Sequence, residues 1–276
     1  WEFIIPGRGM DVPNIGAVSL AAAAQEATQS HLMAAGSFPE LMDKVRENLS
    51  RQVRETIASA SSLYIIPAPF LSLMMDGCSE QGRDISLGGR YNNYGIHGTG
   101  IATAVDALYA VQRHIYKEKT VPKARLLAAL ADDFRSDPDL LAVLRHDTAK
   151  MGDNNLEVDQ IAVELLGGFA DLLEGQRNDR GGIFRPGTGS AMYYLWHAAG
   201  LPATADGRRA GEPLSANYAP SLHTRIKGPV SIIQSFTRPD LKRVCNGGPL
   251  TLELHDTLFR NADAVDKVAS LVMGYV

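Results

Sequence analysis

The stretch "GGRYNNYGIHGTGIATAVDAL", residues 88–108, concentrates unusual chemistry in one short segment. It places glycine, tyrosine, asparagine and His97 directly before an apolar helical pattern. Glycine permits positive φ angles and a close approach of the backbone to other groups. Taken alone, such a segment is a tight turn between a strand and a helix.

Three further loops are rich in glycine. They are residues 180–189 (RGGIFRPGTG), 206–213 (DGRRAGEP) and 246–250 (NGGPL), and they carry arginine, asparagine or glutamate beside glycine. Each one by itself is explained as a turn. Four such loops in one chain favour an enzyme, because binding and catalytic residues are commonly placed on loops gathered at one end of a sheet or barrel.

Composition limits the class of protein. The chain has 276 residues, 45% hydrophobic and 21% charged, with a formal net charge of -4. It can bury a sizeable core and shows no basic footprint for nucleic acid. Cys78 and Cys245 lie outside metal-binding spacing, which favours a reducing, cytoplasmic location over a disulfide scaffold. The apolar run 63–75 contains prolines and is too short to span a bilayer, so we expect no membrane partner.

The pattern of hydrophobic residues predicts an α/β fold. No repeat or linker divides the chain, so residues 1–276 read as one domain, and its ends suggest a piece of a longer protein, truncated on both sides. Two β-branched or apolar runs predict buried strands at residues 228–236 and 249–254. The predicted helices are residues 15–36, 39–60, 101–117, 123–134, 138–145 and 156–173.

Common catalytic motifs are absent from the sequence. It has no GxxxxGK[ST], HExxH, GxSxG or CxxC pattern. The arginines around residues 180–189 could cradle a phosphate, although the strand, turn, helix and lysine of a phosphate loop are not in order there. A conventional phosphate-binding α/β enzyme therefore stays open as an alternative.

The order of several segments resembles the glycyl radical enzymes of the pyruvate formate-lyase-like group. The most specific segments are "GGRYNNYG" (88–95) and "ATADGRRAGEPLS" (203–215). The resemblance covers nearly the whole chain and implies part of a barrel of ten strands surrounded by helices. It also implies a small-molecule substrate, a homodimer and no metal. No cofactor is bound directly, since a separate S-adenosylmethionine iron-sulfur activating enzyme installs the glycyl radical.

The two radical residues of such enzymes are not recognisable here. Gly274 in "VMGYV" lacks the Arg-Val that precedes the radical glycine in the family, so we interpret it as a helix residue. The opening Trp1-Glu2 resembles the end of the family's G-C-x-E motif, which makes Glu2 a candidate catalytic acid or base. Cys78 in "DGCSEQG" also matches G-C-x-E, but a neutral cysteine after an apolar run is more often structural.

The resemblance also suggests residues that bind the substrate. In the family, the loop around residues 88–100 faces the substrate, which makes Asn92 and His97 candidates, and the turn before residue 15 feeds a polar side chain, here Asn14, into the cavity. The structural alternatives are a turn for Asn92, a buried carbonyl partner for His97 and a helix N-cap for Asn14. Gly189 and Ser190 stand where several relatives carry tyrosine, which leaves room for a larger substrate. We expect His97 and Ser190 to face one cavity.

The function expected from the resemblance is radical cleavage of a C–C or C–X bond in a small organic acid. The room at Gly189 and the form of residues 91–100 favour an arylacetate-type substrate. The alternatives are a glycyl radical dehydratase, a formate acetyltransferase-like enzyme, or an inactive truncated fragment that lacks both radical residues.

Overall fold

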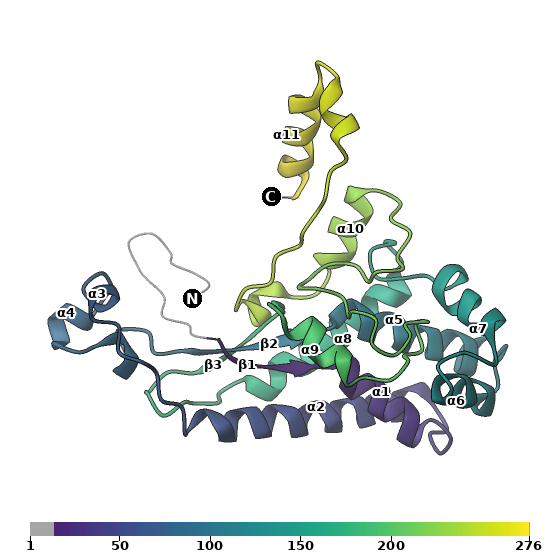
Figure 1. The fold of residues 1–276 in the computed structure, drawn as a ribbon, viewed down its shortest axis with the longest axis horizontal. Coiled ribbons are helices and arrows are strands. Elements are labelled where there is room, and N and C mark those ends of the chain that lie inside the picture. The colour runs from purple at the N-terminus through teal and green to yellow at the C-terminus, as the bar shows by residue number, and fades with distance from the viewer. Residues whose placement is uncertain (1–13, 276) are drawn as a thin grey trace.

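A parallel three-stranded sheet lies at the centre of the protein (Figure 1). The computed structural model describes residues 14–275. Strand β2 (Tyr94–Thr99) lies between β1 (Asn14–Ser19) and β3 (Phe184–Gly187). Helices follow these strands, so the α/β class is confirmed, and the described residues supply three strands of the expected ten.

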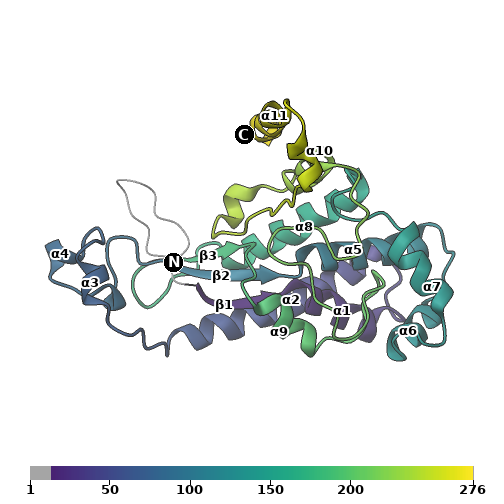
Figure 2. The same ribbon diagram turned by 45° about the horizontal axis from the view of Figure 1, so that its top comes forward.

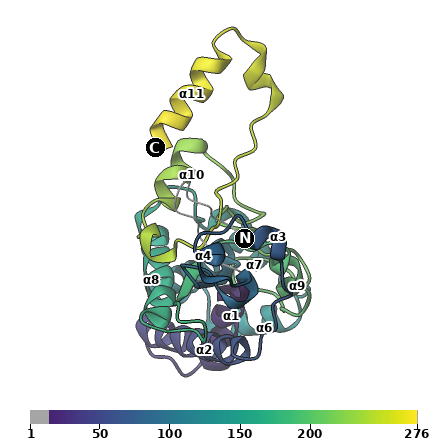
Figure 3. The ribbon, with the colours of Figure 1, turned by 90° about the vertical axis from the view of Figure 1, so that its left-hand side faces the viewer.

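Helices make up most of the remaining chain. Helices α1, α2, α5 and α8 pack on one another and against the sheet. Helix α10 packs on this body through buried Ile232 and Phe236, whereas α11 extends away from it (Figures 2 and 3). The short helices α3 and α4 form an arm at one end of the long axis, and α6 and α7 lie at the other (Figure 1). The helices are α1 (Leu20–His31), α2 (Phe38–Ala60), α3 (Pro69–Ser72), α4 (Cys78–Gln81), α5 (Ile101–Val111), α6 (Lys123–Ala131), α7 (Pro138–Ala142), α8 (Leu156–Leu173), α9 (Tyr193–Ala199), α10 (Pro229–Phe236) and α11 (Ala264–Tyr275).

The helices with clear caps lie where the sequence predicts them. Helix α2 begins after Ser37, whose hydroxyl accepts from the backbone N–H of Glu40, while the Glu40 carboxylate accepts from the N–H of Gly36. This reciprocal arrangement satisfies amide groups that have no partner inside the helix. Helix α8 begins after Asn155, whose side-chain oxygen accepts from the N–H groups of Glu157 and Val158. Both predictions, residues 39–60 and 156–173, are confirmed.

The first predicted helix is partly wrong. Residues 14–19 form β1, and the helix begins only at Leu20, with Ser19 as its N-cap. Alanine-rich sequence gives little periodic signal. The pairing of β1 with β2 fixes the extended conformation, and it buries Val18 against the helices.

The two predicted strands near the C-terminal end are wrong. Residues 229–236 form helix α10, with Pro229 in its first turn, where the missing N–H of proline costs nothing. Residues 249–254 have no regular secondary structure. The strands that do form, β2 and β3, are rich in glycine and were hidden by the turn-like composition of their sequences.

Residues 246–248 lie along the free edge of β3. The N–H of Asn246 donates to the carbonyl of Pro186 at 3.0 Å, and the N–H of Thr188 donates to the carbonyl of Gly247 at 3.0 Å. The Thr188 hydroxyl also donates to the Gly247 carbonyl, at 3.1 Å. The glycine loop "NGGPL" therefore extends the sheet beyond β3.

A buried carboxyl group joins α5 to two loops. Asp106 is fully buried; it accepts from the N–H of Met151 at 2.7 Å and from the hydroxyl of Ser221. Burial raises the pKa of Asp106 from 3.8 to about 7, although nearby Lys150 lowers it. The folded protein therefore binds a proton at Asp106 that the unfolded chain releases.

We predict that Asp106 makes the protein less stable as the pH rises from about 4 toward 7. Over this range the unfolded chain has lost the proton and the folded state still holds it, so the free energy of unfolding falls by up to about 1.4 kcal/mol per pH unit. Asp106→Asn keeps both hydrogen bonds without titrating, so urea denaturation at pH 5, 6 and 7 should show a flatter slope. Exposed Asp139→Asn is the control, and an unchanged slope in Asp106→Asn would contradict the prediction.

Candidate functional site

The two faces of strand β2 differ sharply. Tyr94 and Ile96 belong to the hydrophobic core, and a β-carbon on Gly98 would meet Leu20 of α1 and Phe169 of α8. Alternate residues of a strand point to opposite sides. Gly95, His97 and Thr99 therefore share the other side, which we call the polar face of the sheet.

His97 lies at the middle of the polar face and is 2% exposed. Its neighbours in the adjacent strands are small, Ala17 in β1 and Gly187 in β3. An ideal β-carbon on Gly189 would lie 2.5 Å from Cε1 of the His97 ring. The backbone just after β3 thus passes directly against the imidazole, and only glycine fits there.

A pocket of about 700 Å³ opens on the far side of this backbone. It is lined by residues 188–191, 217–218 and 247–250, together with Leu241, Val244 and Cys245. Two of its lining residues, Ala191 (φ 43°) and Asn217 (φ 49°), have left-handed backbone conformations without being glycine. Such conformations cost of order 1 kcal/mol and persist where the surrounding structure enforces them, often at binding sites.

Ser190 and Asn217 hold the pocket loops together. The N–H of Asn217 donates to the Ser190 hydroxyl at 2.8 Å, and the N–H of Ser190 donates to Asn217 Oδ1 at 2.9 Å. Ser190 is fully buried. It therefore lies on the same loop as Gly189, with its hydroxyl engaged by the opposite loop, whereas His97 is not among the residues that line this pocket. A cavity shared by His97 and Ser190 stays a prediction.

Asn14 and Asn246 meet over Gly95. Asn246 Nδ2 donates to Asn14 Oδ1 at 2.7 Å, and a β-carbon on Gly95 would lie 2.1 Å from Asn246 Nδ2 and 2.5 Å from Asn14 Oδ1. Asn14 is the first residue of β1, and Ser19 is the N-cap of α1. The capping alternative for Asn14 is therefore wrong, and its side chain lies on the polar face.

The remaining sequence candidates lie elsewhere. Asn92 precedes β2, where its carbonyl accepts from Asn178 at 2.6 Å, which agrees with its role as a turn residue. Cys78 is buried in the α3–α4 arm, away from the polar face (Figure 1). Gly274 lies within helix α11, as expected. Glu2 lies outside the described residues.

The loop formed by the segment "ATADGRRAGEPLS" (203–215) is held by hydrogen bonds from the buried Arg208 side chain. The Arg208 guanidinium is buried and donates to the carbonyls of Leu201, Arg209 and Glu212, at distances between 2.7 and 3.1 Å. Burial lowers the pKa of Arg208. Arg145 adds bonds to Gly207 and Glu212, each of 2.6 Å. Arg208 thus fixes its own loop, and neither Arg208 nor Arg209 lines the pocket.

His197 of α9 is a polar-face residue that sequence reasoning missed. Its Nδ1 lies 2.8 Å from the Thr99 hydroxyl, and burial lowers its pKa. Tyr193, one helical turn earlier, stacks against it at 5.6 Å. The spacing of Tyr193 and His197 on one helix face was the available signal. His114, in the segment after α5, is hydrogen-bonded at both ring nitrogens, by Thr120 and Thr148.

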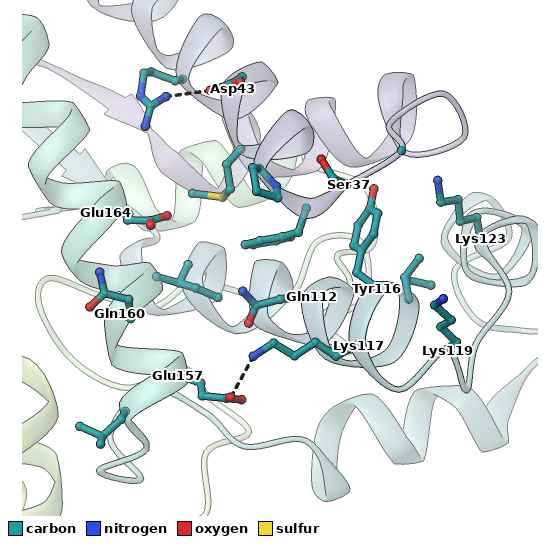
Figure 4. A pocket seen from close by; sticks show the side chains of 18 residues that line it. Ser37, Asp43, Gln112, Tyr116, Lys117, Lys119, Lys123, Glu157, Gln160 and Glu164 are labelled. Atoms are coloured by element: carbon teal, nitrogen blue, oxygen red, sulfur yellow. Dashed lines mark hydrogen bonds and ion pairs between the residues drawn. The ribbon is translucent and has the colours of Figure 1, made fainter.

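A larger pocket, of about 1100 Å³, lies among α2, the segment after α5 and the start of α8 (Figure 4). Lys117 and Glu157 pair across it at 2.8 Å, and Arg46 pairs with Asp43 at 2.9 Å. None of its lining residues belongs to the sheet. It is a groove between helices, remote from the groups gathered on the polar face.

Residues 14–275 contain neither a cluster of metal-ligating side chains nor a helix that could span a membrane. No group of three His, Cys, Asp or Glu side chains is placed there to hold a metal ion. Across the same residues, every helix falls short of the length and hydrophobicity that a membrane span requires.

Comparison with known proteins places this site in a family. The family model described as pyruvate formate lyase-like matches residues 21–196. The chain belongs to this family. The match includes β2, β3 and the loop that carries Gly189 and Ser190, and it leaves out Asn14 and Asn246.

The named relatives are enzymes about three times as long as this chain. Trans-4-hydroxy-L-proline dehydratase of Clostridioides difficile is 26% identical over 246 residues, which cover 87% of this chain and 31% of that protein. (2S)-3-sulfopropanediol dehydratase of Klebsiella oxytoca is 26% identical over 255 residues, covering 87% and 30%. The structure of the B12-independent glycerol dehydratase from Clostridium butyricum aligns with a TM-score of 0.86 at 25% identity, over 94% of this chain and 35% of that one.

We predict that Gly189→Ala displaces the His97 ring, because the new β-carbon would overlap Cε1. The expected loss of stability is about 1–3 kcal/mol, as for other overpacked sites. Denaturant unfolding measures the loss, and the NMR signals of the His97 imidazole report the displacement. Gly167→Ala, in open space within α8, is the matched control and should be neutral or stabilising. Unchanged His97 signals in Gly189→Ala would refute the contact.

Proposed function

We propose that this chain is part of a glycyl radical dehydratase that cleaves a C–O bond of a small hydroxylated substrate. The observation that carries the proposal is the polar face, where buried His97 lies near buried Asn246, which hydrogen-bonds partly buried Asn14 over Gly95. Buried groups of this kind bind ligands by hydrogen bonds in a space that excludes water.

The relatives favour dehydration over the arylacetate reading. Those named above are dehydratases of hydroxyproline, a sulfonated propanediol and glycerol. A further relative, from Desulfovibrio desulfuricans, is an isethionate sulfite-lyase, which widens the range to C–S cleavage. The dehydratase alternative is therefore the better supported, and the extra room at Gly189 is assigned to the His97 ring rather than to an aromatic substrate.

Each candidate residue has a role in this proposal. His97 binds an anionic or hydroxyl group of the substrate, since imidazole can donate or accept near neutral pH. The side-chain amide of Asn14 hydrogen-bonds to the substrate near its hydroxyl group. Gly189 leaves space for His97, Ser190 fixes the loop through Asn217, and Asn92 shapes the turn before β2.

The radical chemistry would come from outside the described residues. A glycyl radical, installed by a separate S-adenosylmethionine iron-sulfur activating enzyme, would supply the hydrogen-atom abstraction that starts the reaction. The residues of this chain would hold the substrate, exclude water and assist departure of the hydroxyl group. The ten-stranded barrel, a homodimer and a cytoplasmic location belong to the same proposal.

We predict that His97→Ala weakens substrate binding in the complete protein without preventing radical installation. The activated protein is assayed with trans-4-hydroxy-L-proline, glycerol, 1,2-propanediol and 3-sulfopropanediol, and electron paramagnetic resonance monitors the radical. KM should rise at least tenfold while the radical signal stays at the wild-type level. If the wild-type protein carries the radical and dehydrates none of these alcohols, the dehydratase proposal fails. If no radical can be installed, the inactive-fragment alternative is favoured.

We predict that Glu2→Gln abolishes turnover and leaves the glycyl radical signal unchanged. The expectation rests on the resemblance of Trp1-Glu2 to the end of the family's G-C-x-E motif, where a carboxylate can move a proton as the substrate is activated. Glu26→Gln, on helix α1, is a control carboxylate that should retain activity. Full activity of Glu2→Gln would show that its carboxylate is only a solvated surface group.

A further inference from the structure

Asn246 is a buried side chain that lies on the polar face although it comes from a distant loop. It is 1% exposed, and its Nδ2 lies over Gly95, where it donates to Asn14. The loop is firmly placed, because the backbone of Asn246 donates to Pro186 and the Thr188 hydroxyl donates to the next carbonyl. A side chain held this way keeps a single orientation.

One polar atom of Asn246 remains unsatisfied. Its Oδ1 is buried and has no hydrogen-bond partner among the described residues. A buried carbonyl oxygen without a donor costs of order 1–3 kcal/mol, and native proteins seldom leave one without a reason. Asn48, another buried asparagine, donates to the carbonyl of Ala23 between two helices and leaves no such atom in the same set.

The neighbours of Asn246 exclude a simple packing role. Both amides replace the side chain that Gly95 lacks, and a β-carbon on Gly187 would overlap the Asn246 carbonyl. Because Gly95 in β2 and Gly187 in β3 have no side chains, Asn246 can lie across both strands. Apolar side chains would fill the same volume without an unsatisfied oxygen.

We propose that Asn246 is a specificity-determining residue whose Oδ1 accepts a hydrogen bond from a hydroxyl group of the substrate. This inference rests on the proposed function and adds a residue from the loop at 246–250 to the site. Asn246 Nδ2 meanwhile engages Asn14 Oδ1, which leaves the Asn14 amide group as a donor for a second substrate oxygen. Together the two amides select a substrate with a hydroxyl group beside an acceptor.

The test is calorimetric binding to the complete protein, without activation. The probes are two matched pairs, trans-4-hydroxy-L-proline against L-proline and 3-sulfopropanediol against propane-1-sulfonate. The wild-type protein should prefer the hydroxylated member of at least one pair. Asn246→Leu should reduce that preference roughly tenfold, the value of one buried hydrogen bond. Asn246→Asp retains an acceptor oxygen and should keep the preference, and Asn48→Leu is the control for loss of a buried amide.

Two results would overturn the inference: no hydroxyl preference in the wild-type protein, or the same preference in Asn246→Leu. Unfolding curves show whether Asn246→Leu folds, and if it does not, Asn246→Asp and Asn246→Ala are compared instead. Turnover of the activated protein is measured separately. If the protein dehydrates a substrate but Asn246→Leu leaves the hydroxyl preference unchanged, only the inference about Asn246 fails. If the preference depends on Asn246 but no dehydration occurs, only the proposed reaction fails.

Discussion

The contact between the backbone at Gly189 and the His97 ring is the constraint on which the polar face depends. A β-carbon at residue 189 would lie 2.5 Å from the ring, so the loop after β3 can cover His97 only because it carries glycine. The same loop brings Ser190 to Asn217 and lets residues 246–248 extend the sheet. One close approach therefore joins β2, β3 and two loops into a single site.

Buried charges hold the loops that form this site. Arg208 donates to four backbone carbonyls of its own loop, those of Leu201, Pro202, Arg209 and Glu212. Lys150 donates to the carbonyls of Leu144 and Asp206 at 2.8 Å each. Asp106, in helix α5, accepts hydrogen bonds from Met151 and Ser221 and so joins α5 to two loops. Removing one member would leave the others buried without partners, which is expensive. The segment "ATADGRRAGEPLS" is therefore part of a connected network of buried polar groups.

The sequence predicted the parts of the fold whose signals are local. Helices α2 and α8 were predicted because the spacing of apolar residues along a helix is a local signal, and Ser37 and Asn155 cap them in the structure. The strands were missed because glycine in β2 is required by groups distant in the chain, such as Leu20, Phe169 and Asn246. His97, Gly189 and Ser190 were candidates through the family resemblance, and the structure puts the first two in contact. Asn246 was missed because 232 positions separate it from Asn14, its partner.

The glycines of the site also limit which substitutions relatives of this chain can carry. Gly95, Gly187, Gly189 and Gly248 each face atoms within 2.5 Å of where a side chain would begin, and three of those contacts involve His97 or Asn246. These four positions should therefore stay fixed as landmarks in an alignment of relatives, even where overall identity is near 26%, while the pocket lining between them drifts with the ligand.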